Sequence, residues 1–188
     1  MEAKIYYFEK PGPKNTEATL KIARQRTKEL GIKQIILAST HGETARKALE
    51  VFRDMDVEII VVYIPHTFEK FGHCMDSKVK KELEEKGATV ITTLCALGGD
   101  VNDAFVQTEE SNTPNVVVGK TLKRFSQGMK VCVEIVLMAT DTGIIDMDKE
   151  IIAIAGSTNG ADTAVVVKPA YPREFMHLWI REILAKPR

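Results

Sequence analysis

Uninterrupted apolar runs, rich in β-branched residues, recur along this 188-residue chain, and segments with helical spacing separate most of them. The runs cover residues 34–38, 57–63, 88–94, 150–155 and 163–167. Strands with one face in water alternate apolar and polar residues, whereas strands covered on both faces are apolar throughout. The sequence therefore predicts an α/β fold with three layers, α/β/α, and a mostly parallel central sheet.

Helical spacing predicts the layers that cover this sheet. We expect helices at about residues 16–30, 43–54, 76–87 and 120–142. Thr16 is the expected cap of the first helix, Gly31 its end, and Leu20, Ala23, Thr27 and Leu30 its buried face. The last of the four is apolar nearly all round from residue 129 to 139, so we expect it to be one long, buried helix.

The C-terminal part of the chain allows two arrangements. The run at 163–167 either forms a hairpin with the run at 150–155 or lies at an edge of the sheet. Residues 172–184 place Phe175, Leu178, Trp179 and Ile183 at helical spacing. We therefore expect one domain over residues 1–188 with a C-terminal helix at about 172–184, docked on this domain or on a second subunit of a homo-oligomer.

Charge and composition exclude some classes of function. Twenty-six basic residues balance 26 acidic ones, which gives no electrostatic reason to expect nucleic-acid or membrane-surface binding. No apolar run approaches the roughly 18 residues that indicate a membrane span. The N-terminus does not resemble a signal peptide, and three widely spaced cysteines indicate reduced thiols. We therefore expect a cytoplasmic protein.

The turn after the first buried strand is the strongest candidate for a binding site. It consists of Ser39, Thr40, His41, Gly42, Glu43 and Thr44, and a helix follows it. Free amides and the helix dipole favour an anion there, glycine lets a phosphate approach the backbone, and hydroxyls add donors. The alternative is that the hydroxyl residues only cap the helix.

A second loop, residues 156–162, follows another buried strand. Its candidate binding residues are Gly156, Ser157, Thr158, Asn159, Gly160 and Asp162. Ligands of open parallel sheets lie beyond the carboxyl ends of the strands, so we expect both loops to border one crevice. A tight turn at Asn159-Gly160 is the alternative.

The irregular segment 65–75 is a candidate lid, with Pro65, Thr67 and Phe68 as its candidate binding residues. Its Phe68 and Phe71 either cover a flat ring or fill the core. Its His66, His73 and Cys74 fit no zinc spacing, so no metal is expected. Gly98-Gly99-Asp100 is a further candidate for the crevice. Glu134, four residues after Lys130, is interpreted as a paired charge rather than a catalytic acid. No standard nucleophile motif occurs, so catalytic residues are unknown.

Three segments carry a resemblance to a known family: residues 39–46 (Ser-Thr-His-Gly-Glu-Thr-Ala-Arg), 127–134 and 141–145. They resemble the C-terminal α/β domain of pyruvate kinase, and above all a stand-alone archaeal and bacterial family similar to that domain. The resemblance implies a mainly parallel sheet in which the strand at residues 34–38 lies beside the strand at residues 150–155.

The resemblance also implies a ligand. In pyruvate kinases the equivalent turn holds a phosphate of a sugar bisphosphate effector, and in the stand-alone family the expected ligand is flavin mononucleotide (FMN). It assigns Ser39, Thr40, Gly42 and Thr44 as phosphate donors, whereas His41 and Glu43 depart from the kinase pattern. Pyruvate kinase activity is not expected, because that chemistry belongs to a barrel domain of about 200 residues or more.

Three functions stay open at this stage. The first is an FMN-binding protein, with or without a flavoenzyme reaction. The second is a regulatory or sensor domain that binds a sugar phosphate or nucleotide without catalysis. The third is an assembly module that uses the long helix and the C-terminal segment around Trp179.

Overall fold

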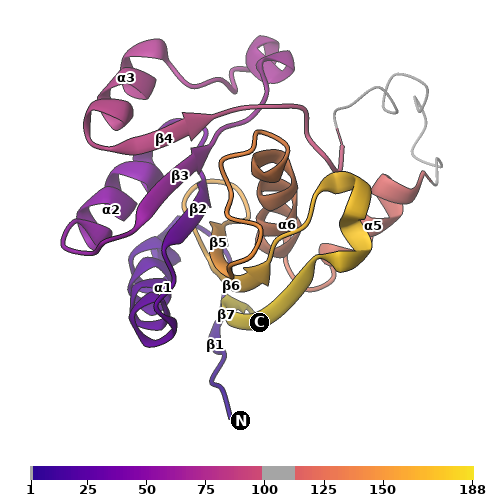
Figure 1. Ribbon diagram of the computed structural model, residues 1–188. Helices are drawn as coiled ribbons and strands as arrows, with labels where there is room; N and C mark the ends of the chain where they lie inside the picture. The colour runs from indigo at the N-terminus through magenta and orange to yellow at the C-terminus, as the bar shows by residue number, and fades with distance from the viewer. Residues whose placement is uncertain (1, 99–112) are drawn as a thin grey trace.

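The computed structural model describes residues 2–98 and 113–188. Its helices and strands form three layers, with the sheet in the middle and helices on both of its faces (Figure 1). The strands are β1 (Tyr6–Phe8), β2 (Gln34–Ala38), β3 (Glu58–Val62), β4 (Ala88–Ile91), β5 (Ile151–Ala155), β6 (Thr163–Lys168) and β7 (Trp179–Pro187). The α-helices are α1 (Thr16–Leu30), α2 (Glu43–Phe52), α3 (Ser77–Glu85), α5 (Pro114–Leu122) and α6 (Gln127–Thr140). Short 3₁₀ helices are η1 (Pro13–Asn15), η2 (His66–Phe71) and η3 (Pro172–His177).

The sheet is mixed but mostly parallel, with the strand order β1-β7-β6-β5-β2-β3-β4. The strands β5, β2, β3 and β4 run parallel to one another, and β6 runs antiparallel to both of its neighbours. The predicted fold class is therefore confirmed, and so is the pairing of β2 with β5. Of the two arrangements open for residues 163–167, the structure contains the hairpin.

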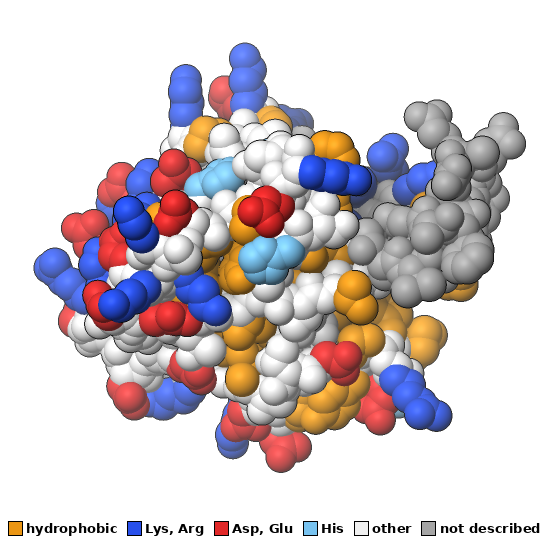
Figure 2. Space-filling view, turned by 90° about the horizontal axis from the view of Figure 1, so that it is seen from above, with side chains coloured by type: hydrophobic (Ala, Val, Ile, Leu, Met, Phe, Trp, Pro, Cys, Tyr) orange, Lys and Arg blue, Asp and Glu red, His pale blue; other side chains and the backbone are white. Residues whose placement is uncertain are grey.

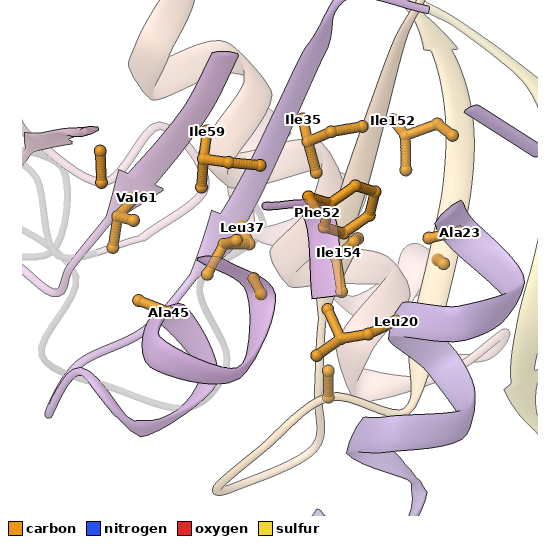
Figure 3. Packing of buried hydrophobic residues seen from close by; sticks show 14 of the residues in the cluster. Leu20, Ala23, Ile35, Leu37, Ala45, Phe52, Ile59, Val61, Ile152 and Ile154 are labelled. Atoms are coloured by element: carbon orange, nitrogen blue, oxygen red, sulfur yellow. The ribbon is translucent and has the colours of Figure 1, made fainter. Parts of the chain in front are cut away.

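Each face of the sheet packs against its own helices, which explains why its strands lack an alternating pattern. On one face the helices α1, α2 and α3 supply Leu20, Ala23, Phe52 and Leu83 to a buried cluster with the strands (Figure 3). On the other face α6 packs its apolar side chains against β2, β3, β5 and β6. Because β2, β3 and β5 are covered from both sides, their side chains are apolar throughout, apart from the end residues Gln34 and Glu58.

The prediction of a C-terminal helix at 172–184 is wrong. Residues 172–177 form the 3₁₀ helix η3, and residues 179–187 form the strand β7. That strand lies between β6 and β1, so its backbone groups pair with two neighbours. Apolar residues in a short segment fit helical and extended spacing almost equally well, and this pairing decides in favour of the strand. The segment does dock on the domain, as part of the sheet.

The single long helix predicted at 120–142 is divided in two. The helix α5 ends at Leu122, and α6 begins at Gln127 after Ser126, whose hydroxyl oxygen accepts a hydrogen bond of 2.9 Å from the Met129 amide. Ser126 is therefore the N-cap of a new helix. The expected burial of the segment after it is confirmed, because α6 is buried from residue 132 to its end.

Two details of α1 also differ from expectation. The N-cap position is Asn15, and Thr16 instead bridges two segments: its hydroxyl donates to the Pro13 carbonyl and accepts from the Ala161 amide. Leu30, expected on the buried face, is 38% exposed. Gly31 ends the helix in the left-handed region as predicted. Among the described residues, no helix has the length and apolar character needed to cross a bilayer.

Candidate functional site

A cavity of about 310 Å³ lies at the carboxyl ends of β2, β3 and β5. The turn after β2 and the loop after β5 border it, so the two predicted loops do meet at one crevice. Figure 2 looks down on this edge of the sheet and shows histidine and acidic side chains beside apolar ones. The volume lies within the range of about 300–1,000 Å³ that is common for small-molecule sites.

The turn after β2 leads directly into a helix. The Ala45 amide donates to the Ser39 hydroxyl oxygen at 3.3 Å, and the Arg46 amide donates to the Gly42 carbonyl at 2.9 Å. The amides of Glu43 and Thr44 precede them in the first turn of α2, where an α-helix offers no internal acceptor. Thr40 and Thr44 lie in the cavity wall beside these amides. This end of α2 therefore has the donors that an anion requires.

Gly42 has a packing role that the sequence did not predict. Its backbone is left-handed, with φ of 88°, and it does not line the cavity. A Cβ built on Gly42 would lie 2.5 Å from Cγ1 of Val79 in α3. The glycine therefore permits the close packing of α2 against α3, and its contact with a phosphate stays a prediction.

The loop after β5 is fixed by its own hydrogen bonds. Asp162 is completely buried and accepts from the Gly12 amide at 2.9 Å, the Ser157 hydroxyl at 2.7 Å and the Thr163 hydroxyl at 2.9 Å. The Ala161 amide donates to the Thr16 hydroxyl at 2.9 Å. Since Asp162 has its acceptor atoms occupied and does not line the cavity, it holds the loop in place rather than facing a ligand.

The chain matches the family described as "Pyruvate kinase, alpha/beta domain" over residues 17–167. It belongs to this family. Two solved structures are similar to it. A pyruvate kinase of Cryptosporidium parvum in complex with ADP is 16% identical, with a TM-score of 0.40, 82% of this chain covered and 24% of that one. A second crystal structure of a C. parvum pyruvate kinase gives 16% identity, a TM-score of 0.38, and 80% and 22% coverage. The chain thus spans about a quarter of the length of these kinases.

In this pyruvate kinase-type α/β domain, most of the predicted site residues line the cavity. Those that do are Ser39, Thr40, His41, Glu43, Thr44, Pro65, Phe68, Gly156, Ser157, Thr158, Asn159 and Gly160. Gly42, Thr67 and Asp162 do not line it. Of the candidate Gly98-Gly99-Asp100, Gly98 lines the cavity, whereas the other two lie outside the described residues.

A charged pair in the cavity wall was not predicted as part of the site. The Lys130 ammonium lies 2.6 Å from both carboxylate oxygens of Glu134, and the two side chains are 16% and 8% exposed. The predicted pairing is confirmed, but both residues border the cavity. Their i,i+4 spacing indicates the ion pair in the sequence. Their position at the crevice follows only from the packing of α6 against the sheet.

Most of the large apolar side chains in the cavity wall come from two parts of the chain. Val62, Ile64 and Phe68 belong to β3 and the segment after it, and Val131, Ile135 and Met138 belong to α6. The phosphate-type donors and this apolar wall border the same cavity. The cavity therefore combines hydrogen-bond donors with apolar surface, as small-molecule sites commonly do.

An ion pair outside the cavity supports the turn. Arg46, the last residue of the family-like segment 39–46, donates to Glu82 of α3 at 2.7–3.2 Å. The guanidinium lowers the pKa of Glu82 to about 2 through hydrogen bonding, with Lys86 adding to the effect, and Glu82 raises the pKa of Arg46. Arg46 therefore links α2 to α3 and is not one of the residues that line the cavity.

Proposed function

We propose that this domain binds a phosphate-bearing small molecule, with FMN as the expected ligand, in the crevice between residues 39–44 and 156–160. The observation that carries the proposal is the meeting of a helix start, rich in amide and hydroxyl donors, with an apolar wall in one cavity. The phosphate would accept from the amides of Glu43 and Thr44 and from the hydroxyls of Thr40 and Thr44.

The apolar wall supports a flat, aromatic end for this ligand. Ile64 and Phe68 from the segment after β3 and Met138 from α6 offer apolar surface to an isoalloxazine ring. Thr158 and Asn159 are exposed, lie in the loop after β5 and border the cavity. Their side chains would form hydrogen bonds with sugar or ribityl hydroxyls. The Ser157 hydroxyl is already donated to Asp162, so we assign it no ligand contact.

A second candidate is a sensor that binds a sugar phosphate or nucleotide without catalysis. An ion pair in the cavity wall favours it, because Glu134 neutralises the ammonium of Lys130. A neutralised cation is poorly suited to activating a reacting group. We expect no pyruvate kinase activity from this chain in either case.

The test is an absorbance spectrum of the purified, desalted protein before and after addition of excess FMN. Retained flavin bands are expected, together with lower flavin fluorescence on binding. Binding of sugar phosphates or nucleotides in competition with a phosphate probe, without flavin retention, would support the sensor. Failure of FMN, sugar phosphates, nucleotides and inorganic phosphate to bind at all would contradict both.

A matched pair of variants locates the phosphate. Thr40→Asp places a carboxylate beside the helix start and should abolish binding through charge repulsion, whereas Thr67→Asp adds the same charge to an exposed residue outside the cavity. Equal affinities of the two variants would exclude the turn as the phosphate site.

A further inference from the structure

A cluster of three potential metal ligands lies in the segment between β3 and α3. His66, Glu69 and Cys74 place their ligand atoms within 4.8 Å of one another. The Nδ1 atom of His66 is 3.6 Å from Sγ of Cys74 and 3.8 Å from a carboxylate oxygen of Glu69. One imidazole nitrogen therefore faces both a thiol and a carboxylate.

The local backbone explains why these side chains converge. In the 3₁₀ helix η2, residues three apart lie above one another, which places Glu69 over His66. Gly72 then adopts a left-handed conformation with φ of 78°, and the His73 amide donates back to the Phe68 carbonyl. This reversal returns the chain to the side of His66, where Cys74 follows.

The second nitrogen of the imidazole has its own partner. Nε2 of His66 lies 3.4 Å from the hydroxyl of Tyr63, which is buried at the end of β3. Metal-bound histidines commonly hold their free ring nitrogen in this way, because the outer hydrogen bond fixes the ring orientation. Tyr63 would thus act as a positioning residue and direct Nδ1 toward Cys74 and Glu69.

From this geometry we propose that His66, Glu69 and Cys74 form a binding site for Zn²⁺. A mixed set of imidazole, thiolate and carboxylate ligands suits Zn²⁺ better than Mg²⁺ or Ca²⁺, which prefer oxygen alone. With bond lengths of about 2.3 Å to sulfur and about 2.0 Å to nitrogen, tetrahedral coordination separates the two ligand atoms by about 3.5 Å. The observed separation of 3.6 Å needs almost no adjustment on that edge.

The site is open on its outer side. His66 and Glu69 are exposed and Cys74 is half-buried, so a metal ion can enter without unfolding the domain. Three protein ligands leave a fourth tetrahedral position for water or another ligand. The sequence shows His66, His73 and Cys74 in one irregular segment, whereas Glu69 joins His66 and Cys74 only through the turn of η2.

The experiment uses the 188-residue chain, metal-free and reduced, with Co²⁺ as a spectroscopic probe and Zn²⁺ as competitor. A bound Co²⁺ ion should show a sulfur-to-metal charge-transfer band in the near ultraviolet and intense tetrahedral visible bands, and Zn²⁺ should remove both. Cys74→Ser should abolish the charge-transfer band. Cys95→Ala, which removes a buried thiol in the cavity wall, should retain it.

Affinity measurements complete the test. Both His66→Ala and Cys74→Ser should weaken Zn²⁺ binding by about 100-fold or more, because loss of even an outer-shell partner costs about 10–100-fold. His177→Ala, which removes an exposed imidazole of η3, should leave the affinity unchanged. A charge-transfer band that persists in Cys74→Ser, or equal Zn²⁺ affinities of His66→Ala and His177→Ala, would overturn the assignment. The substituted residues other than Cys95 lie on or near the surface, and circular dichroism checks that each variant is folded.

Discussion

The two loops that border the crevice have similar compositions but opposite hydrogen-bond states. The turn 39–44 leads into a helix and has first-turn amides without internal acceptors, whereas the loop 156–162 leads into a hairpin and is fixed through Asp162 and Thr16. Glycine and hydroxyl residues thus have two uses at one sheet edge. In the first loop the hydroxyls of Thr40 and Thr44 border the cavity, whereas in the second the Ser157 hydroxyl donates to Asp162 and the Ala161 amide donates to Thr16. The predictions below test this difference.

The largest effect is expected from Asp162→Ala. The substitution leaves the Gly12 amide and the Ser157 and Thr163 hydroxyls without their shared acceptor in a buried position. The free energy of unfolding should fall by about 3 kcal/mol, since unsatisfied buried donors cost about 1–3 kcal/mol each and are not additive. Urea denaturation measures it, with the exposed Asp148→Ala as control, for which a change under about 0.5 kcal/mol is expected. Equal losses in both variants would show that the second loop is not held by this carboxylate.

Gly42→Ala should be the next most destabilising change. It forces a side chain into a left-handed backbone and against Val79, at a cost of about 2 kcal/mol. Gly143→Ala is the control, because Gly143 has φ of 77° but open space around its Cβ position. Gly143→Ala should lower the free energy of unfolding by about 1 kcal/mol, which is the contribution of the left-handed backbone alone. Combining Gly42→Ala with Val79→Ala should recover the difference, and no recovery would exclude the contact with Val79 as its cause.

Exchanging hydroxyls between the loops should separate ligand affinity from stability. Thr44→Val should weaken binding of FMN or inorganic phosphate by about 10-fold, the loss of one hydrogen bond to a charged group, with little change in unfolding. Ser157→Ala should do the reverse, because its hydroxyl is bound to Asp162. Isothermal titration calorimetry and thermal unfolding of both variants measure the two effects. A larger affinity loss in Ser157→Ala than in Thr44→Val would reverse the assigned roles of the loops.

The smallest effect is expected for the ion pair between Arg46 and Glu82, whose contribution to stability should depend on pH. The pKa of Glu82 is lowered from 4.5 to about 2 in the folded state, chiefly by the hydrogen bond from Arg46. A lowered folded-state pKa stabilises the protein above the unfolded value, and this stabilisation is lost as the pH falls from about 4.5 through about 2. Wild type should therefore be slightly more stable than Glu82→Gln at neutral pH, and the difference should vanish in acid. A difference that stays constant across this range would show that the Glu82 charge does not contribute, since exposed ion pairs contribute little in many proteins.

The sequence by itself determined the layered fold and the first turn, because both depend on local signals. Uninterrupted apolar runs indicate strands covered on both faces, and residues 39–44 combine a strand end with a helix start within a few positions. The end of α1 at Gly31 follows for the same reason, since a single residue decides it.

The tertiary structure alone decided the features that depend on distant partners. The segment after η3 is a strand because β6 and β1 lie on either side of it, and the break before α6 depends on how Ser126 meets both the Met129 amide and the Thr163 hydroxyl. The pair of Lys130 and Glu134 lies at the crevice only because α6 packs on the face of the sheet beside the cavity. Local spacing contains no information on such contacts, since their free energy comes from pairing and burial between segments far apart in the chain.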